Sequence, residues 1–464
     1  MHQRLEIKNF SKSDQWKFGV IMYKSILQKS IFPILEMANR SKIQQRLHFL
    51  RESERWNLSR LQNFQEEKLR RLLEHAYENV PYYKRIFQER NLLPKDIDPG
   101  NLNKIPILDK DTIRKNNREL VAKNIPKSQL IHSLTSGSTG RPLEFYRTKK
   151  QEDWYWALRY RAWAWGGYDM GDPYIRAAWR SQPLKKKIQH YLTRCTFFQF
   201  SNVNEKLLDH YLNYIRESKI KKAEGFPSTF YLLARHARKR NIGDIKIDTI
   251  MTSGEMLFPH YRTLIEEQFQ AKIFDNYAAG GEGMTMAAQC EFRDGYHINM
   301  ESVILEFLMN ETPVSNGDVG KIYITALDNY AFPLIRYDIE DVGKPVKREC
   351  ACGRKLVLMD SVEGRTADII VTPDGYYIGV SFFMALFKQV KGINTFQIIQ
   401  EKPAQLLIRI VKNGSFQSDG VEFLKTKISE MCNGSLEMKF EFVEHIAPAA
   451  SNKRRFVISN VSLC

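Results

Sequence analysis

Apolar residues recur at helical spacing through the first part of the chain, from Trp16 to about Asn91. This spacing places them on one face of a helix, where they can pack against a core. The clearest run stops at Val80-Pro81, because proline interrupts helical hydrogen bonding. Residues 1 to about 95 are therefore expected to form a helical opening segment. Its most regular apolar face consists of Leu69, Leu72, Leu73 and Ala76.

The middle of the chain alternates between helical and extended patterns. The predicted helices include Leu207–Ser218 and Phe230–Arg240, and extended segments follow at Ala223–Phe226 and Ile250–Glu255. Such alternation is typical of an α/β body. Further on, Val303–Leu308 and Lys321–Thr325 are expected to be hairpin strands around the turn residues Ser315–Asp318, which indicates a β-rich subdomain.

After Gly364-Arg365 the pattern changes to short strands and single helices. Strands are expected at Ile369–Val371, Phe396–Gln400 and Leu406–Val411, with a helix at Ser381–Val390. We therefore expect an α/β protein with two parts, a large N-terminal domain of several subdomains at 1–363 and a small α+β domain at 364–464.

The composition is that of a globular protein, with 43% hydrophobic and 27% charged residues in 464. The formal charge of +17 indicates an anionic partner, which could be a nucleotide, a nucleic acid, an acidic glycan or a membrane surface. The basic residues are scattered and no nucleic-acid motif accompanies them, so a solvated basic surface is favoured over nucleic-acid binding.

The chain shows no signal-peptide pattern and no apolar run of the roughly 20 residues that cross a bilayer. Residues Phe18–Met37 could form a helix that lies on a membrane, although a core-packing helix explains them more simply. Six cysteines in 464 residues, with two in a Cys-Ala-Cys pair, favour a reducing cytoplasm.

A run of hydroxyl and glycine residues suggests a phosphate-binding loop. It lies between the apolar Leu134 and the predicted strand Leu143–Tyr146. Glycine backbones allow successive N–H groups to converge on an anion, and the hydroxyls add donors. The run lacks the Gly-Lys-Ser/Thr ending of a Walker A loop, so a strand-loop-strand clamp is expected, with an ordinary surface turn as the alternative. Its members are Thr135, Ser136, Gly137, Ser138, Thr139, Gly140 and Arg141.

Two clusters of soft ligands suggest a structural zinc site. Cys290 and His297 form the first cluster, and Cys350 and Cys352 form the second. Cysteine and histidine together suit tetrahedral Zn²⁺, and two thiolates one residue apart at a glycine-ended turn can converge on one ion. Buried free thiols beside an unrelated histidine are the alternative.

Five motifs occur in an order that resembles the adenylate-forming enzymes, the superfamily of acyl-CoA synthetases. Within it, the likeness is to the phenylacetate-CoA ligase branch, which includes CapK-type capsular-polysaccharide proteins, through Leu73–Tyr83 and Asn452–Val457. The Cys-x-Cys-Gly-Arg form also occurs in that branch. The motifs are the Thr135–Arg141 loop, Ser253–Glu255, Asn276–Glu282, Pro333–Asp341 and Gly364-Arg365.

The resemblance implies ATP and Mg²⁺ as cofactors, conversion of a carboxylic acid to acyl-AMP with release of pyrophosphate, and a mobile C-terminal domain. It implies that the loop holds the β- and γ-phosphates, that Glu282 holds Mg²⁺ and that Asp341 binds ribose. Arg365 would add charge near ribose or phosphate, and Lys453 would bridge carboxylate and α-phosphate. The adenine would lie against Ser253, Gly254, Glu255, Tyr277 and Ala278.

Two positions depart from the family pattern. The aromatic-glycine pair falls at Ala278-Ala279, with Tyr277 one place early, which leaves adenine stacking open. The acidic hinge residue is replaced by Ala367, followed by Asp368. Because hinge rotation brings in the second half-reaction, transfer to CoA is less strongly implied than adenylation.

The resemblance implies an acid pocket near Gly225–Phe230 and the residues around Ala279, with Phe226, Phe230 and Tyr231 making it partly apolar. The aromatic stretch Trp154–Trp165 is expected to pack in the core. The acceptor could be CoA, a glycan amine or another nucleophile, and the resemblance implies a role in capsule or surface-polysaccharide synthesis. A non-catalytic nucleotide- or glycan-binding scaffold and a polymer-binding protein are the alternatives.

Overall fold

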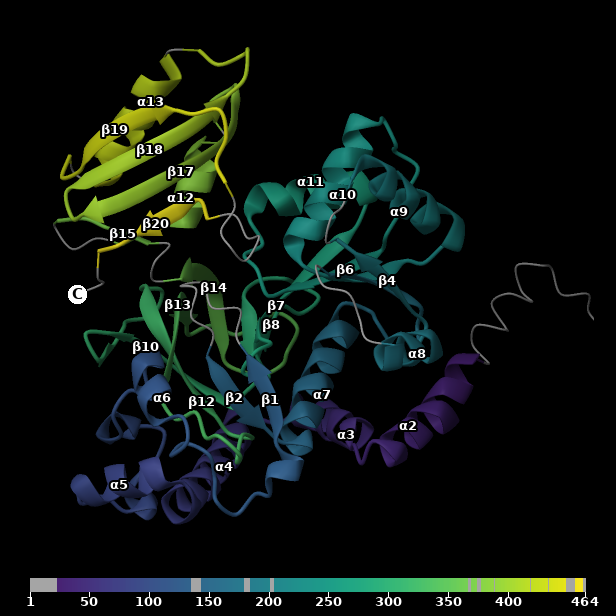
Figure 1. Ribbon diagram of the computed structural model, residues 1–464, viewed down its shortest axis with the longest axis vertical. Coiled ribbons are helices and arrows are strands. Elements are labelled where there is room, and N and C mark those ends of the chain that lie inside the picture. Colours follow the sequence, from purple (N-terminus) through teal and green to yellow (C-terminus); the bar gives the residue numbers. More distant parts are fainter. Residues whose placement is uncertain are drawn as a thin grey trace, which may run out of the picture.

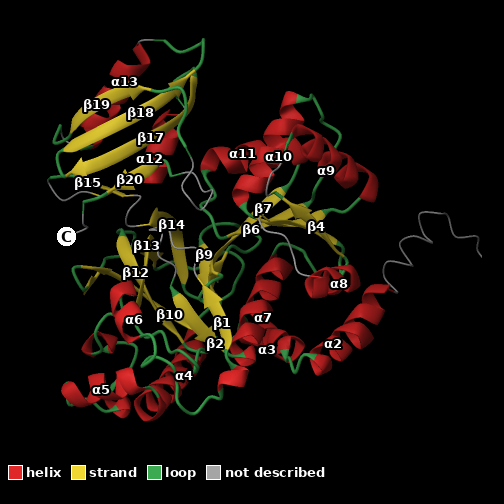
Figure 2. Cartoon of the chain, in the orientation of Figure 1, coloured by secondary structure: helices red, strands yellow, loops and turns green. Residues whose placement is uncertain are grey.

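The computed structural model describes residues 23–134, 143–178, 184–200, 204–365, 369–373, 377–387, 389–417, 419–432, 434–447 and 455–461. The chain forms a large body with helices at its base and a separate sheet domain at its C-terminal end (Figure 1). Figure 2 shows that strands run through both parts while helices cover their outer faces. Among the described residues, no helix has both the length and the apolar character needed to cross a membrane.

Helices open the chain, as the periodicity predicted. The predicted stop at Val80-Pro81 is a junction between two helices, since α4 ends at Asn79 and α5 begins at Pro81. Proline fits there because the first residue of a helix needs no intrahelical N–H partner. Asp109 caps the short helix α6 (Lys110–Asn116) by accepting a hydrogen bond from the Thr112 amide at 2.6 Å. The opening elements are η1 (Leu27–Ile31), α2 (Phe32–Ala38), α3 (Ile43–Ser53), α4 (Leu58–Asn79), α5 (Pro81–Glu89), η2 (Pro94–Asp96), η3 (Leu102–Lys104), α6 (Lys110–Asn116) and η4 (Lys127–Gln129).

One sheet of twelve strands passes through the whole body. One half is parallel and the other is mainly antiparallel, and the two halves meet where β7 pairs with β6 in parallel and with β8 in antiparallel orientation. The strand order is β11-β10-β12-β13-β14-β9-β8-β7-β6-β5-β3-β4. The parallel half contains β3 (Tyr174–Ala178), β4 (Cys195–Gln199), β5 (Lys222–Gly225), β6 (Thr249–Ser253) and β7 (Lys272–Ala279). The other half contains β8 (Met284–Ala288), β9 (Tyr296–Ile298), β10 (Val303–Met309), β11 (Thr312–Pro313), β12 (Gly320–Ala326), β13 (Tyr337–Val346) and β14 (Leu358–Arg365).

Helices cover both faces of the parallel half. Ile175, Ala223, Ile250 and Ile273 point to one face, where they share a core with three helices. On the opposite face, Met251 packs with aromatic residues of α7. Because helices cover both faces of these strands, the strands carry apolar residues on both sides. The covering helices are α7 (Lys149–Trp165), α8 (Leu184–Leu192), α9 (Glu205–Ser218), α10 (Pro227–Lys239) and α11 (Pro259–Phe269).

A two-stranded hairpin lies outside the large sheet. Strands β1 (Ile131–Leu134) and β2 (Glu144–Arg147) pair in antiparallel orientation, with Leu134 opposite Glu144. The hairpin confirms the strands expected on either side of the 135–141 loop, and the loop itself lies outside the described residues.

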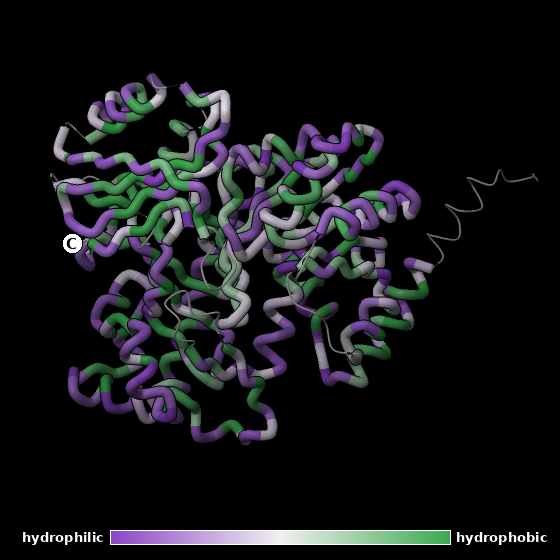
Figure 3. Tube along the Cα trace, turned by 45° about the horizontal axis from the view of Figure 1, so that its top comes forward, coloured by the Kyte–Doolittle hydropathy of each residue, from purple (hydrophilic) through white to green (hydrophobic). Residues whose placement is uncertain are grey.

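The C-terminal part has a sheet of its own, with strand order β19-β18-β17-β20. Its hydrophobic segments gather along the strands, while hydrophilic segments are frequent on the outer helix (Figure 3). It contacts the body where the rings of Phe258 and Phe456 meet edge to face, 5.1 Å between centroids. The elements are β15 (Ile369–Val371), β16 (Tyr377–Gly379), α12 (Val380–Phe387), β17 (Ile393–Lys402), β18 (Gln405–Lys412), α13 (Asp419–Met431), β19 (Glu437–Phe442) and β20 (Val457–Ser459).

A buried ion pair joins the opening helices to the sheet. Arg161 of α7 donates to both carboxylate oxygens of Glu301, at 2.6 and 3.1 Å, and to the Asn299 side chain at 2.6 Å. Ser53 at the end of α3 donates to the same carboxylate at 2.6 Å. Burial opposes ionisation of Glu301, but the Arg161 guanidinium outweighs it, so the pKa of Glu301 lies below its ordinary value.

We expect Glu301→Gln to lower the free energy of unfolding by about 3–5 kcal/mol, because Arg161 then loses its buried counterion. The depressed pKa means that the contribution of Glu301 is present above its ordinary pKa and is lost as pH falls through its folded-state pKa. Urea denaturation followed by tryptophan fluorescence should therefore show a difference from the wild type that shrinks in acid. Glu67→Gln, which breaks the exposed pair with Arg71, should change stability by no more than about 1 kcal/mol.

Candidate functional site

The turn between β7 and β8 carries Glu282, and side chains from three other elements hold its backbone. Ser133 of β1 donates to the Gly281 carbonyl at 2.5 Å. Arg147 of β2 donates to Ser133 at 3.0 Å and reaches the Gly281 carbonyl at 3.4 Å. Gln151 of α7 donates to the carbonyls of Glu282 and Gly283, at 3.1 and 3.5 Å. Three successive carbonyls of the turn are thus held by fixed donors.

These contacts bring the two strands that flank the predicted phosphate loop to the Glu282 turn. Ser133 and Arg147 lie in the two strands of the hairpin, directly before and after residues 135–142. Because both residues contact the Gly281 carbonyl, the hairpin that flanks that segment is fixed beside the turn. Thr135, Ser136, Gly137, Ser138, Thr139, Gly140 and Arg141 themselves lie outside the described residues.

Two predicted carboxylates approach one another from distant parts of the chain. Glu282 is 8% exposed and accepts a hydrogen bond from the Tyr337 hydroxyl at 3.3 Å. The Tyr277 hydroxyl donates to Asp341 at 2.8 Å. Burial raises the pKa of Glu282, and the charge of Asp341 raises it further, while Lys110 opposes both effects. The candidate site therefore contains two acidic side chains close enough for the charge of one to affect the ionisation of the other.

Arg365 is the residue of β14 that pairs with Asp341 of β13. The backbones of Asp341, the predicted ribose ligand, and Arg365, the predicted cation near ribose or phosphate, therefore lie side by side. The Arg365 side chain is not among those described. The predicted Lys453 and the hinge positions Ala367 and Asp368 also lie outside the described residues.

The predicted adenine segment lies at the end of the neighbouring strand. Ser253 ends β6 and pairs with Asn276 of β7, so the Ser253–Glu255 turn lies next to the segment that leads to Glu282. Gly254 has φ of +79°, and a Cβ there would lie 3.0 Å from Cε1 of Phe226. Both the backbone and the close approach therefore require glycine. Glu255 accepts hydrogen bonds from the Ser228 hydroxyl and, at 3.3 Å, from its amide.

Tyr277 contacts the site through its hydroxyl. It is buried within β7 and donates to Asp341, while Ala278 and Ala279 are half-buried toward the end of the strand.

The expectation for the acid pocket needs one correction. Phe230 is fully buried in the core shared by α10 and the parallel strands, because its helical position faces inward. Tyr231 stacks on Tyr261 with ring centroids 4.0 Å apart.

Cys290, His297, Cys350 and Cys352 come together as predicted, with their ligand atoms all within 4.8 Å of one another. The sulfur atoms of Cys290 and Cys350 are 3.6 Å apart, and the Cys352 sulfur is 3.3 Å from Nε2 of His297. Burial raises the pKa of Cys290 to about 12 and lowers that of His297 to about 4. Without a cation, burial therefore favours the neutral thiol of Cys290 and the neutral imidazole of His297, and imidazole in that form can bind a metal.

The sheet determines where the four ligands lie. Cys290 follows β8, His297 belongs to β9, and the Cys350–Cys352 turn joins β13 to β14. The pairing of His297 with Leu358 brings the ends of these strands together. Gly353 closes the turn with φ of +80°, and its amide donates to the Cys350 carbonyl at 3.1 Å.

Several residues of the site were missed by the sequence reasoning. Tyr337 lies inside the Pro333–Asp341 motif without an assigned role. Gln151 and Arg147 carry no local signal, because their partners lie more than a hundred residues away. Trp154, Trp163 and Trp165 are buried, which confirms their predicted packing role. Between them, Arg159 forms an ion pair with Glu224 that the sequence did not predict.

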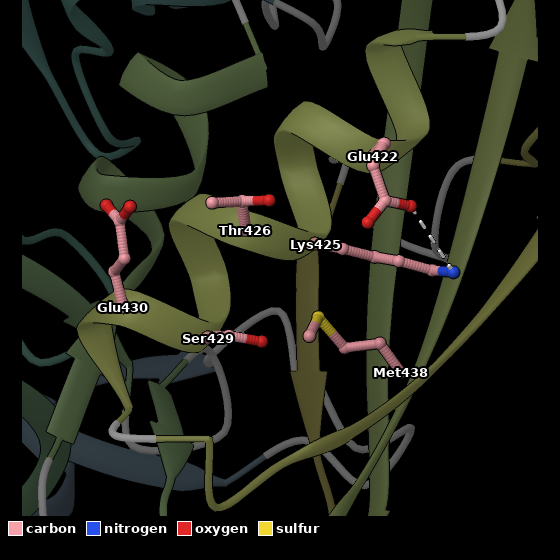
Figure 4. A pocket seen from close by; sticks show the side chains of 6 residues that line it. All are labelled: Glu422, Lys425, Thr426, Ser429, Glu430 and Met438. Atoms are coloured by element: carbon pink, nitrogen blue, oxygen red, sulfur yellow. Dashed lines mark ion pairs between the residues drawn. The ribbon is translucent and has the colours of Figure 1, made fainter.

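A separate hollow lies on the outer face of the C-terminal domain (Figure 4). Helix α13 and strand β19 line it, and Glu422 and Lys425 form an ion pair along α13 at 3.9 Å. None of the predicted site residues lines it, so it is not part of the candidate site. The lining residues are Glu422, Lys425, Thr426, Ser429, Glu430 and Met438.

Comparison with known proteins agrees with the resemblance found in the sequence. Residues 370–460 match the CapK C-terminal domain family. Protein CapK of Staphylococcus aureus is 23% identical over 418 residues, which cover 86% of this chain and 89% of CapK. A phenylacetate-coenzyme A ligase of Thermus thermophilus is 25% identical over 321 residues, covering 67% of this chain and 72% of the ligase.

A solved structure shares the fold. The 2-hydroxyisobutyryl-CoA ligase in its postadenylation state, in complex with R3-HIB-AMP, superposes with a TM-score of 0.71 at 21% identity, covering 88% of this chain and 91% of the ligase. The chain is thus homologous to CapK and to phenylacetate-CoA ligases, and it has the α/β fold of the adenylate-forming ligases. Together these relatives indicate an AMP-forming ligase.

We expect Gln151→Leu to loosen the turn that carries Glu282, because two buried carbonyls lose their donor. Amide hydrogen exchange of residues 280–285 should become faster, and the free energy of unfolding should fall by about 1–3 kcal/mol. Gln405→Leu is the matched control, because Gln405 is exposed and bonds only the exposed Glu437 in the described structure. Unchanged exchange in the turn of the Gln151 variant would contradict the role of this contact.

Proposed function

We propose that this protein adenylates a carboxylic acid with ATP and then transfers the acyl group to CoA or another nucleophile. In the first step an oxygen of the acid attacks the α-phosphorus of ATP, a new phosphorus–oxygen bond forms, and pyrophosphate leaves. The observation that carries the proposal is the approach of Glu282 and Asp341, with the Glu282 turn tied to both strands that flank residues 135–142. A nucleotide requires these groups together, although they are distant in the sequence.

Each group has a role that suits its chemistry. The Thr135–Arg141 loop would hold the β- and γ-phosphates through hydroxyl and backbone donors. Asp341 would accept hydrogen bonds from ribose hydroxyls, with its position set by the Tyr277 hydroxyl. The Ser253–Glu255 turn would lie against adenine, beside Tyr277 and Ala278. Arg365 and Lys453 would add positive charge where negative charge develops in the transition state.

Glu282 suits Mg²⁺, because a carboxylate is a hard oxygen ligand. Its raised pKa fits this role, since a buried carboxylate without a bound cation favours the neutral form. When bound, the cation would neutralise phosphate charge. The fixed carbonyls of Gly281, Glu282 and Gly283 keep the Glu282 backbone in one orientation for it.

We further propose that residues 1–363 act as the adenylation domain and residues 364–464 as a small mobile domain. The end of β14 at Arg365 and the start of the CapK C-terminal match at residue 370 support this division. The likeness to CapK supports a role in capsule or surface-polysaccharide synthesis, with a glycan amine as an alternative acceptor to CoA. The described cysteines are free thiols, which suits a cytoplasmic enzyme.

We expect the wild-type protein to release pyrophosphate with at least one member of a carboxylic-acid library, and mass spectrometry to detect the acyl-AMP. Asp341→Ala should lower kcat/KM for ATP by about 10- to 100-fold, because a charged hydrogen-bond acceptor is lost. Asp360→Ala is the matched control, an exposed aspartate of the neighbouring strand that pairs with Arg348. ATP binding without an acyl-AMP for any acid would overturn the proposal and favour a nucleotide-binding scaffold.

We also propose that Cys290, His297, Cys350 and Cys352 hold one structural Zn²⁺. The purified protein should contain about one zinc per chain by elemental mass spectrometry, and Cys352→Ser should remove most of it. Chelation should lower the thermal midpoint, because metal binding couples to folding. Cys432→Ser should retain the zinc, since Cys432 lies in the C-terminal domain and donates to the Ile428 carbonyl. Zinc-free wild-type protein of unchanged stability would contradict the assignment.

A further inference from the structure

Two arginines share one glutamate on the face of the parallel sheet that α7 covers. Arg159 of α7 pairs with Glu224 of β5 at 3.1 Å, and Arg176 of β3 pairs with its other oxygen at 2.5 Å. In the part of the chain that the structure describes, no second carboxylate pairs with either guanidinium. The three charges therefore sum to one net positive charge.

The net positive charge of the Arg159, Arg176 and Glu224 cluster lies in a largely buried place, where an unpaired charge is unfavourable. Arg159 is 5% exposed and Glu224 is 3% exposed. The Nε atom of Arg159 is buried without a hydrogen-bond partner among the described residues. A buried charge that lacks a counterion is unfavourable. The rings of Tyr155, Trp156 and Trp163 around Arg159 offset part of this cost, and a further anion would neutralise the charge.

The cluster adjoins the segments that we assign to the substrates. Arg159 donates to the Ser253 hydroxyl at 3.3 Å and to the Tyr155 hydroxyl at 3.2 Å. Ser253 begins the predicted adenine turn, and the Tyr155 hydroxyl lies 3.9 Å from the position of a Cβ on Gly280, in the turn before Glu282. In open α/β sheets ligands bind beyond the carboxyl ends of the strands, and Arg159 reaches that edge at Ser253, the last residue of β6.

The same contacts leave donors available for an anion. Both hydroxyls act as acceptors toward Arg159, so each keeps its own O–H to donate. Arg176 retains 22% exposure of its side chain, which makes it the accessible member of the pair. Guanidinium groups bind carboxylates in a two-bond geometry that a neutral polar group cannot match.

We propose that the acid adenylated by this enzyme carries a second anionic group, such as a second carboxylate, and that Arg159 and Arg176 bind it. The proposal rests on the adenylation function. With that group bound, two guanidiniums face two anions and the buried charge is neutralised. Arg176 thereby sets specificity for a dianionic acid over a monoacid of the same length.

The test compares matched acids with the wild type and Arg176→Met. Glutarate is compared with pentanoate, and (4-carboxyphenyl)acetate with phenylacetate, by pyrophosphate release at saturating ATP and by calorimetric binding. The wild type should prefer the dianionic member by about 10-fold or more, which corresponds to one buried charged contact. Arg176→Met should lower the values for the dianionic acids by more than those for the monoacids and so remove the preference, and Arg176→Lys should retain part of it.

The possible outcomes separate the two proposals. The specificity proposal is overturned, and adenylation stands, if the wild type uses the monoacids as well as or better than the dianionic acids. It is also overturned if Arg176→Met changes the values for both members of each pair equally. If no acid releases pyrophosphate, adenylation fails, and calorimetry still decides whether the cluster prefers dianions. Glu224→Gln provides a second variant, because it leaves both arginines and should increase the preference for the dianionic member. Absence of that increase in a folded protein would also count against the proposal.

Discussion

The antiparallel pairing of β7 with β8 is the constraint on which the rest of this structure depends. On one side β7 continues a parallel sheet, and on the other β8 begins an antiparallel one. A turn is therefore required at the point where the two types of sheet meet, and that turn carries Glu282. Cys290 lies just after the end of β8. Asp341 lies on β13, where it pairs with β14, and contacts Tyr277 of β7. The order of the strands thus assembles groups that the sequence separates.

The site gains its rigidity from outside the turn. A glycine-rich segment would be free to adopt many conformations, but the hairpin and α7 hold three of its carbonyls. Fixed groups stabilise developing charge better than mobile ones, because no reorganisation is needed at the moment of reaction. The same α7 carries Arg159 toward the parallel strands and Arg161 toward Glu301. One helix therefore links the Glu282 turn, the Arg159–Glu224 pair and the buried Arg161–Glu301 pair.

Local patterns predicted the elements that local forces determine. The expected helix at Leu207–Ser218 is α9, and the expected strands at Val303–Leu308 and Lys321–Thr325 are β10 and β12. The four residues of the Cys/His cluster could be found because cysteine is scarce and its spacing is distinctive. In contrast, the contacts of Gln151 and Arg147 join residues far apart in sequence and leave no periodic trace. Phe230 was misplaced because its motif context suggested a pocket, whereas its position in α10 faces the core.

The Cys/His cluster also has a consequence for the unfolded chain. A metal ion bound by Cys290 and Cys350 would join two residues that are 60 positions apart. Closing a loop of that length removes conformations from the unfolded ensemble, an effect of about 4 kcal/mol in simple chain-entropy terms. Asp341 lies inside this loop and Glu282 lies just outside it. The cluster would thus act as a cross-link that limits how far the two carboxylates can separate, even when the surrounding strands fluctuate.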